Sequence, residues 1–311
     1  MRLTHSRAVA LMVLVALMWS IAGVVSRHLE SARSFEVSFW RSAFTVLALT
    51  LALGWMRGPA LIADIRRGGW PLWLSGLCWA VMFTNFMVAI MLTTVATVLV
   101  TLAIAPLLTA LFARVFLHHK LPTRTWVAIA VAGAGIAWMF GRQAFTGSAS
   151  LVGAMVALGV PLAAATNWTL LQHLHQRHAR ASAARDPRAG DPSVREPDML
   201  PAVLIGALLS ALATLPLALP FSATTGDLSL LALLGVVQLA VPCLLVVTLA
   251  KVLPAPEISL LALLEVIFGV LLAWVGAGEV PGPAAQAGGA LVVSALLVNE
   301  GLALRERRAR P

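Results

Sequence analysis

The chain has 311 residues, of which 60% are hydrophobic and only 11% are charged, and its mean hydropathy is +0.91. A soluble globular protein has about 25% charged residues, so this composition excludes an ordinary soluble enzyme, and it also excludes a disordered chain. The formal net charge of +9 is compatible with nucleic-acid binding, but the basic residues stand between apolar runs and form no basic domain. We therefore expect a membrane protein that binds no nucleic acid.

Apolar runs follow one another along the chain, each close to the roughly 20 residues that a helix needs to cross a bilayer. Short gaps separate several of them, so consecutive helices must be antiparallel neighbours. The period-two alternation of a membrane β-barrel is missing from the sequence. We expect an all-α polytopic membrane protein with ten transmembrane helices, at residues 8–26, 36–56, 70–90, 94–116, 124–141, 151–172, 199–219, 228–250, 255–276 and 284–303.

The distribution of lysine and arginine predicts the orientation. With the N-terminus in the cytoplasm and ten alternating spans, 18 of the 22 basic residues fall on the cytoplasmic side, as the positive-inside rule requires. The other four, which we assign to the opposite side, are Arg27, Arg33, Arg41 and Arg142. The first run is too long for a signal peptide and carries Trp19 near its end, so we expect it to be retained. Both termini are predicted to be cytoplasmic.

Residues 173–198 form one long polar segment, which is basic and contains three prolines. This composition cannot bury enough apolar surface to fold alone. We interpret the segment as a solvated cytoplasmic linker. A regulatory or nucleic-acid-binding tail is the alternative, and no interleaved aromatic residue supports it.

The two halves of the chain are similar to each other. Residues 105–139 align without a gap with residues 265–299, and Trp19-Ser20 in the first span correspond to Trp168-Thr169 in the sixth. Because five spans per half is an odd number, the halves must cross the membrane in opposite directions. Transporters with inverted repeats place their substrate site near the midplane between the repeats. We expect five-helix repeats at 1–146 and 147–311, the second carrying the linker.

Several segments also resemble a known family. They are ALMWSIAGVVSRHL (16–29), FWRSAFTVLAL (39–49), TTVATVLVTLAIAPLLTALFARVFLHHKLPTR (93–124) and GVVQLAVPCLLVVTLAKVLPAPEISLLALLEVIFGVLLAWVGAGEVP (235–281). In their order and spacing the chain resembles the drug/metabolite transporter superfamily, in its ten-span EamA-like branch. His119 or Lys120 stands where that family usually has an acidic residue, which Glu279 keeps in the second half. Val266 stands where a proline often follows the glutamate of that family, which is Glu265 here.

The resemblance implies a secondary or facilitative carrier that exports small metabolites by alternating access. Bacterial inner-membrane exporters of amino acids, including aromatic ones, are the most similar members. A multidrug or nucleobase-like exporter is the alternative within the superfamily. A membrane-embedded enzyme is the alternative outside it. Such an enzyme would need clustered His, Asp or Glu at a membrane face, but Glu265 has no second acidic residue near it in its span, and the sequence contains no P-loop. We expect no enzyme activity, no cofactor and no metal. The expected partners of a monomeric chain are a small-molecule substrate and the lipid bilayer.

Polar side chains inside a span are costly and usually face the bundle interior or a water-filled cavity. Glu265, near the middle of the ninth span, is a candidate counter-charge for a substrate amine or a proton-coupling group. A structural glutamate bonded to a neighbouring helix is the alternative. The amides of Asn85, Asn167 and Gln238 suit the carboxylate and ammonium of an amino acid, or hydrogen bonds between helices.

Aromatic residues inside the spans are candidates for the walls of a cavity. Trp79 and Phe83 are one helical turn apart and share a face of the third span, while Trp19 and Trp168 lie in the first and sixth. Such rings stack on apolar groups or hold an ammonium group, although most membrane tryptophans lie at the interface. We expect the third, sixth and ninth spans to meet at a cavity lined by Trp79, Asn85, Trp168 and Glu265.

Three prolines lie deep inside predicted spans. Each removes a backbone donor and kinks its helix, and transporters use broken helices for sites and hinges. Prolines are also common in membrane helices for other reasons. The candidate hinges are Pro106, Pro161 and Pro242.

Overall fold

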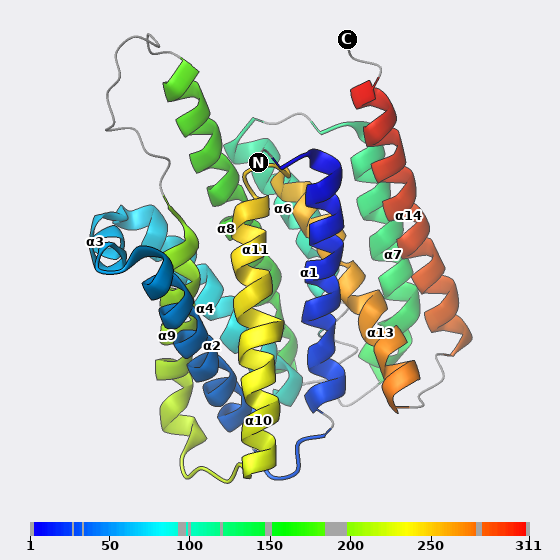
Figure 1. Cartoon of the computed structure of the whole chain (residues 1–311). Coiled ribbons are helices and arrows are strands. Elements are labelled where there is room, and N and C mark those ends of the chain that lie inside the picture. Colours follow the sequence, from blue (N-terminus) through cyan, green and yellow to red (C-terminus); the bar gives the residue numbers. More distant parts are fainter. Residues whose placement is uncertain are drawn as a thin grey trace.

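The computed structural model describes residues 3–26, 28–32, 34–92, 98, 101–118, 121–146, 151–183, 198–277 and 282–308, and over these residues it is entirely helical. The helices form a bundle of steeply inclined elements, in which α1 begins and α14 ends at the same end (Figure 1). The predicted all-α fold is confirmed. The expected positions of His119, Lys120 and Glu279 fall outside the described residues.

The helices follow the predicted apolar runs. In the first half they are α1 (His5–Ser26), α2 (Ser34–Arg57), α3 (Ala60–Arg67), α4 (Gly69–Leu92), α6 (Ala105–Phe116) and α7 (Thr123–Thr146). In the second half they are α8 (Leu151–Ala183), α9 (Leu200–Ala218), α10 (Thr225–Leu233), the π-helical segment η1 (Leu234–Ala240), α11 (Val241–Leu249), α12 (Ala255–Ala262), α13 (Leu264–Ala277) and α14 (Pro283–Arg308).

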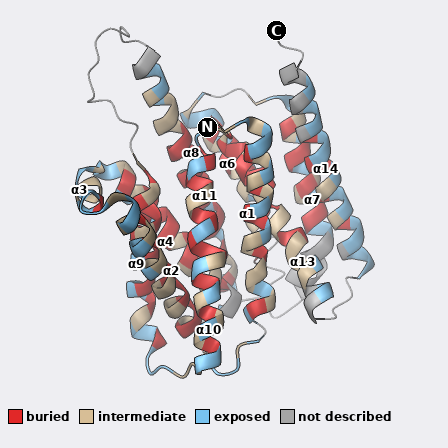
Figure 2. Ribbon diagram, viewed as in Figure 1, coloured by how far each residue is buried: buried red, intermediate tan, exposed pale blue. Residues whose placement is uncertain are grey.

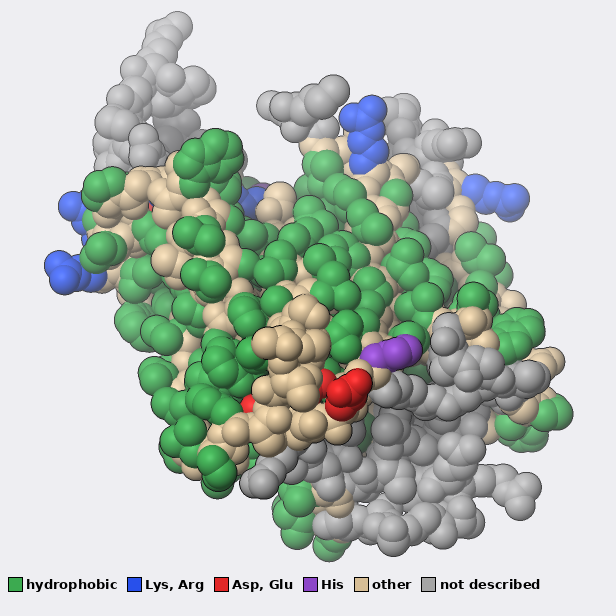
Figure 3. Space-filling model, turned by 60° about the horizontal axis from the view of Figure 1, so that its bottom comes forward, with side chains coloured by type: hydrophobic (Ala, Val, Ile, Leu, Met, Phe, Trp, Pro, Cys, Tyr) green, Lys and Arg blue, Asp and Glu red, His purple; other side chains and the backbone are tan. Residues whose placement is uncertain are grey.

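The described part of the chain holds 7 helical stretches that are long and apolar enough to cross a membrane, and the total of ten spans stays a prediction. The outside of the bundle is apolar. Trp55 is 91% exposed, Leu151 76% and Val275 83%, which fits contact with lipid rather than water. Hydrophobic side chains dominate the visible sides of the molecule in Figure 3, while buried residues line the inner helices in Figure 2.

The structure corrects the predicted linker at 173–198. Residues 173–183 continue α8 as helix, and only 184–197 lie outside the described residues. The reason is local, because residues 173–183 contain three Ala and two Arg, which favour helix, and no Gly or Pro, since all three prolines come after Ala183. The short helix α3 was not expected either, since the sequence indicated only a loop between the second and third spans.

Helices from the two halves pack against one another in matching pairs. α1 contacts α13 and α6 contacts α8, while α2 packs on α9 and α7 packs on α14. These are the pairings expected if residues 105–139 correspond to 265–299, because α6 then matches α13 and α1 matches α8. Close approach requires small residues, since a Cβ at Gly135 in α7 would lie 2.7 Å from the Gly288 carbonyl oxygen of α14. The repeat boundaries at 146 and 147 stay a prediction.

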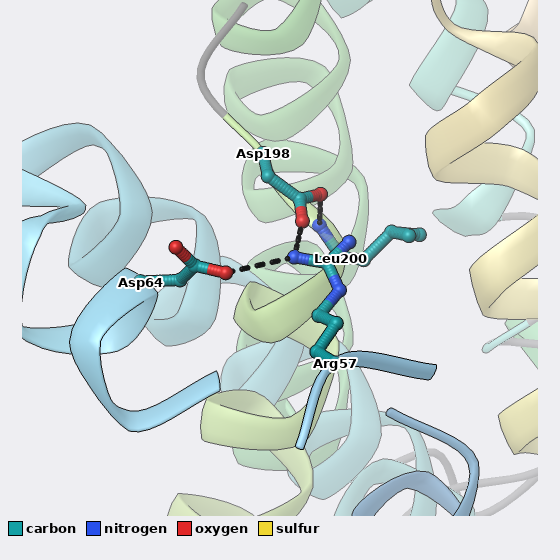
Figure 4. Close-up of polar contacts among 4 residues, drawn as sticks. All are labelled: Arg57, Asp64, Asp198 and Leu200. Carbon is teal, nitrogen blue, oxygen red and sulfur yellow. Dashed lines mark hydrogen bonds and ion pairs between the residues drawn. The ribbon is translucent and has the colours of Figure 1, made fainter. Parts of the chain in front are cut away.

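Charged side chains fasten the loops at both ends of the bundle. At the end where α1 begins, Arg57 of α2 forms ion pairs with Asp64 of α3 and with Asp198 (Figure 4). The distance from Arg57 Nη1 to Asp64 Oδ2 is 3.2 Å. Asp198 also accepts a hydrogen bond of 3.0 Å from the Leu200 amide. This contact joins α2, α3 and the start of α9.

At the opposite end two carboxylates accept backbone amides across loops. Glu36 of α2 accepts the amides of Ser222 and Ala223 at 2.8 to 3.0 Å. Asp227 of α10 completes a capping box with Thr224 and accepts the Glu30 amide at 2.8 Å. These bonds hold the loop before α2 against the loop before α10, and thereby fix the depth at which α2 enters the bundle.

Candidate functional site

A cavity of about 140 Å³ lies in the interior of the bundle, between α1, α2, α4, α6, α8, η1, α11, α12 and α13. A single water needs about 10–15 Å³ of such space, so the cavity holds several waters or a small solute. Its walls are mainly apolar, with four charged or polar side chains among them: Arg41, Gln238, Ser259 and Glu265.

Two interrupted helices border the cavity. α12 ends at Ala262 and α13 begins at Leu264, so the ninth predicted span breaks directly before Glu265. α6 begins at Ala105, the position that the internal alignment pairs with Glu265, and both residues line the cavity. Breaks at matching positions of two half-helices are the arrangement that transporters use to build a midplane site.

Aromatic rings form one wall of the cavity. The rings of Trp79 and Trp168 meet edge to face, with centroids 5.3 Å apart and planes at 78°, and Phe83 lies 5.5 Å from Trp79. Trp79 is only 2% exposed, because α4 packs on α9 at Gly206, where a Cβ would overlap the Cβ of Trp79. Trp19 and Phe86 extend this apolar lining.

Two opposite charges line the same cavity from different helices. Arg41 of α2 is 2% exposed, and its Nη2 donates a hydrogen bond of 3.0 Å to the Phe83 carbonyl oxygen. Glu265 stands in the first turn of α13 and makes no hydrogen bond or ion pair with any residue that the structure describes. The structural alternative for Glu265, a bond to a neighbouring helix, is therefore not seen among those residues.

Several polar atoms of the lining are left without a partner. Among the described residues, Nε of Arg41, Nε1 of Trp79, Oε1 of Gln238 and Oγ of Ser259 are buried and make no hydrogen bond. Gln238 uses only its Nε2, which donates to the Trp19 carbonyl oxygen at 3.3 Å. Buried polar groups in proteins are nearly always hydrogen-bonded, so unsatisfied hydrogen-bonding capacity is concentrated in the residues around the cavity.

Most of the predicted site residues meet at this cavity, and two do not. Trp19, Trp79, Phe83, Trp168, Gln238 and Glu265 all line it. Asn85 instead donates its Nδ2 to the Val156 carbonyl oxygen at 3.2 Å, and Asn167 accepts a 2.6 Å hydrogen bond from Ser75 Oγ. Both asparagines join α4 to α8 outside the lining.

The three prolines occupy different structural positions. Pro161 lies inside α8 and lines the cavity. Pro106 is the second residue of α6, and Pro242 is the second residue of α11, directly after the π-helical segment η1. Pro106 therefore stands in a first helical turn, where the N–H that proline lacks is left unpaired anyway. Pro242 instead lies inside the continuous helical stretch Thr225–Leu249, where π-helical turns change to α-helical ones.

Arg41 was not predicted as a site residue; we counted it among the charges of the side opposite to the cytoplasm, although it lies within the predicted span 36–56, and the structure places it at the cavity. The helix α2 begins at Ser34, so Arg41 lies about 10 Å along it, given a rise of 1.5 Å per residue. A signal was present, since Arg41 follows Phe39-Trp40 inside an apolar run. Among the described residues no group of three or more His, Cys, Asp or Glu could hold a metal ion.

Comparisons with known proteins agree with this architecture. Residues 6–141 match the EamA-like transporter family. A solved structure described as "Crystal structure of protein" superimposes with a TM-score of 0.73 at 18% identity, covering 96% of this chain and 99% of that one, which shows a shared fold. No curated protein matches the sequence. The first half of the chain is thus similar to a family of membrane transporters, and the whole chain shares its fold with the solved structure.

Proposed function

We propose that the protein is a secondary carrier that exports small metabolites, amino acids first among them, across the bacterial inner membrane by alternating access. The observation that carries the proposal is the cavity between the interrupted helices, lined by aromatic rings and by the opposite charges of Arg41 and Glu265. An amino acid presents the matching groups, namely an apolar side chain, a carboxylate and an ammonium.

The energy for transport must come from a solute or ion gradient, because the sequence contains no P-loop that would bind ATP. Glu265 is the candidate for coupling to protons, since it is an acidic group at the cavity that makes no hydrogen bond or close ion pair with a described residue. Substrate binding and proton coupling are the two roles that we assign to it.

Alternating access requires elements that bend around the site. The breaks between α12 and α13 and before α6, the proline inside α8 and the π-helical segment η1 all border the cavity. We propose that ten spans in two inverted repeats, at 1–146 and 147–311, move about these points, with both termini in the cytoplasm. Pro106, Pro161 and Pro242 are the proposed hinges.

The apolar character of the lining also favours a second candidate, a multidrug or nucleobase-like exporter. Uptake into proteoliposomes with a panel of labelled amino acids, run with and without a pH gradient, separates the two. Uptake of apolar amino acids supports the first proposal. Uptake of hydrophobic cations or nucleobases in place of every amino acid would support the second.

A further inference from the structure

We infer that the short helix α3 and the helix ends beside it form a binding surface for the headgroups of anionic phospholipids. Arg66 and Arg67 of α3 bind the headgroup. Trp55, Trp70 and Trp73, which flank α3 in the sequence, hold the surface at the depth of the headgroups. The surface lies on the outside of the bundle, so the inference goes beyond the proposed function and does not depend on the solute that the cavity takes.

The chain changes direction at both ends of α3. Gly58 and Gly69 stand before and after the helix with φ of +56° and +62°, a left-handed conformation that glycine adopts without strain. Gly68 lies so close to Leu72 that a Cβ there would overlap that side chain. As a result α3 leaves the line of α2 and α4 and projects from the side of the bundle (Figure 1).

The inner and outer faces of α3 differ in character. Leu61 is buried and Ile65 packs against the core, while Asp64 on the same face takes part in the ion pairs of Figure 4. The four-residue spacing places Ile62 and Arg66 together on the other face, where both are exposed. An exposed isoleucine beside an exposed arginine is typical of a helix that lies in the membrane interface.

Tryptophans indicate the depth of this surface in the membrane. Trp55 lies in the last turn of α2, and Trp70 and Trp73 lie in the first turns of α4. They are three of the five tryptophans that are exposed among the described residues. Tryptophan concentrates at the level of the headgroups, because its ring is apolar and its N–H is polar. The arginines of α3 therefore stand where lipid phosphates lie.

The charges around α3 are arranged to receive an anion. Asp64 and Asp198 both form ion pairs with Arg57. The side chains of Arg66 and Arg67 form no ion pair or hydrogen bond with a described residue. A guanidinium presents several donors to phosphate oxygens, and two adjacent ones favour a headgroup with a net negative charge over a zwitterionic one. An anionic phospholipid supplies this charge together with acyl chains that contact the exposed tryptophans.

Lipid binding to the purified full chain tests the inference. The protein in detergent is titrated with dioleoyl-phosphatidylglycerol or with dioleoyl-phosphatidylcholine, and native mass spectrometry gives the Kd of the first bound lipid. We expect phosphatidylglycerol to bind about tenfold to thirtyfold more tightly, since each arginine near an anionic membrane surface contributes about a factor of five. Equal Kd values for the two lipids would overturn the inference.

Two double variants with the same change in charge locate the binding. Arg66→Gln combined with Arg67→Gln should lose most of the preference for phosphatidylglycerol, whereas replacement of both by lysine should keep much of it. The matched control is Arg177→Gln combined with Arg180→Gln, which removes two exposed arginines from the part of α8 that extends beyond the bundle (Figure 1). This control should keep the preference. Equal losses in both glutamine double variants would show general attraction to basic residues and overturn the inference.

Tryptophan fluorescence shows where the lipid lies. The protein is placed in vesicles of phosphatidylcholine and phosphatidylglycerol in equal parts, with brominated acyl chains on one lipid or the other. Brominated phosphatidylglycerol should quench the fluorescence more strongly, because it is enriched beside α3. Trp70→Phe should remove most of this difference, while Trp138→Phe, a change at an exposed ring of α7, should not. An unchanged difference in Trp70→Phe would contradict the position of the lipid.

Inorganic phosphate distinguishes a lipid headgroup from a small anion. We expect that added phosphate does not displace phosphatidylglycerol, because it lacks the acyl chains that contact the tryptophans. Displacement by phosphate at constant ionic strength would assign the arginines to a small anion and overturn the inference. The Tm of each variant is measured first. Should the glutamine variant at Arg66 and Arg67 not fold, the order of the two lipids in the unmodified protein and the quenching in Trp70→Phe decide.

Discussion

For Glu265, the free-energy cost of placing a polar group in a membrane helps to identify its role. An acidic side chain at the centre of a membrane helix costs about 2.5–3.5 kcal/mol on insertion scales. Here it stands at a helix break beside a cavity and makes no hydrogen bond or close ion pair with a described residue. The cavity can hold water, which lowers that cost, and the same opening makes the carboxylate accessible to a solute.

We predict that Trp168→Ala weakens binding of large apolar substrates more than that of small ones. The variant removes the ring that meets Trp79 edge to face, and such contacts contribute about 0.5–1.5 kcal/mol beyond area burial. The apparent KM for an aromatic amino acid should rise about two- to twelvefold. Trp138→Ala, a change at a ring that is 67% exposed on the outside, is the control and should leave KM unchanged.

A second prediction separates the asparagines from the cavity residues. Asn167→Ala removes the acceptor of the Ser75 hydroxyl, so it should lower the stability by about 0.5–2 kcal/mol, seen as a lower Tm in detergent. The relative KM values for different substrates should stay as they are. A change in substrate preference without a change in Tm would contradict the position that we assign to Asn167.

Only some of the residues at the cavity could be predicted from the sequence. Trp79, Phe83, Trp168 and Glu265 could be predicted, because an aromatic or acidic residue deep in a span needs a reason to be there. Asn85 and Asn167 could not be assigned to a face, since their helices are apolar all round and show no amphipathic period. Arg41 was not predicted as a site residue, because it lies near the start of α2, where an arginine side chain usually points to the water outside the membrane.

At the scale of elements, the eighth span shows how a helix can be built to change shape. The α-helical α10 passes into the π-helical η1, which places Gln238 at the cavity, and Pro242 follows at the start of α11. π-helical turns are rare and occur frequently at functional sites. The sequence predicted one span at 228–250 with a kink at Pro242, and periodicity alone does not reveal the π-helical turns before that proline.

We predict that Pro242→Ala lowers the turnover of transport several-fold while the protein still inserts and folds. The alanine restores a backbone donor, so the segment can re-form a regular α-helix and stiffen. Turnover is measured in proteoliposomes, with Pro201→Ala at the start of α9 as the control because it lies outside the cavity lining. Equal turnover in Pro242→Ala and the unmodified protein would reduce Pro242 to a packing residue.

At the scale of the whole molecule, the charges of the two ends differ. Arg57, Arg66 and Arg67 lie at the end where α1 begins and α14 ends, and the acceptors Glu36 and Asp227 lie at the other. From the positive-inside rule we predict that the first end faces the cytoplasm. This prediction can be made from the sequence, because it depends on where the basic residues fall between the spans rather than on packing.

Reporter fusions check this topology. A reporter inserted after Ala189 and one fused after Arg308 should both give cytoplasmic signals, whereas a reporter inserted after Ala223 should give a periplasmic one. The insertion after Ala189 falls in a segment that the structure does not describe, and that after Ala223 falls in the loop before α10. A periplasmic signal from either of the first two fusions would contradict the orientation.

The central claim is that a small metabolite crosses the membrane through the cavity, and filling the cavity tests it most directly. Ala164→Trp places a large ring into the lining from α8, whereas Leu162→Trp on the same helix changes a residue that is 45% exposed on the outside. Uptake of labelled L-phenylalanine is measured in proteoliposomes for the unmodified protein and both variants, after equal Tm values have been confirmed. We predict uptake by the unmodified protein and Leu162→Trp and almost none by Ala164→Trp. Undiminished uptake by Ala164→Trp would contradict the claim.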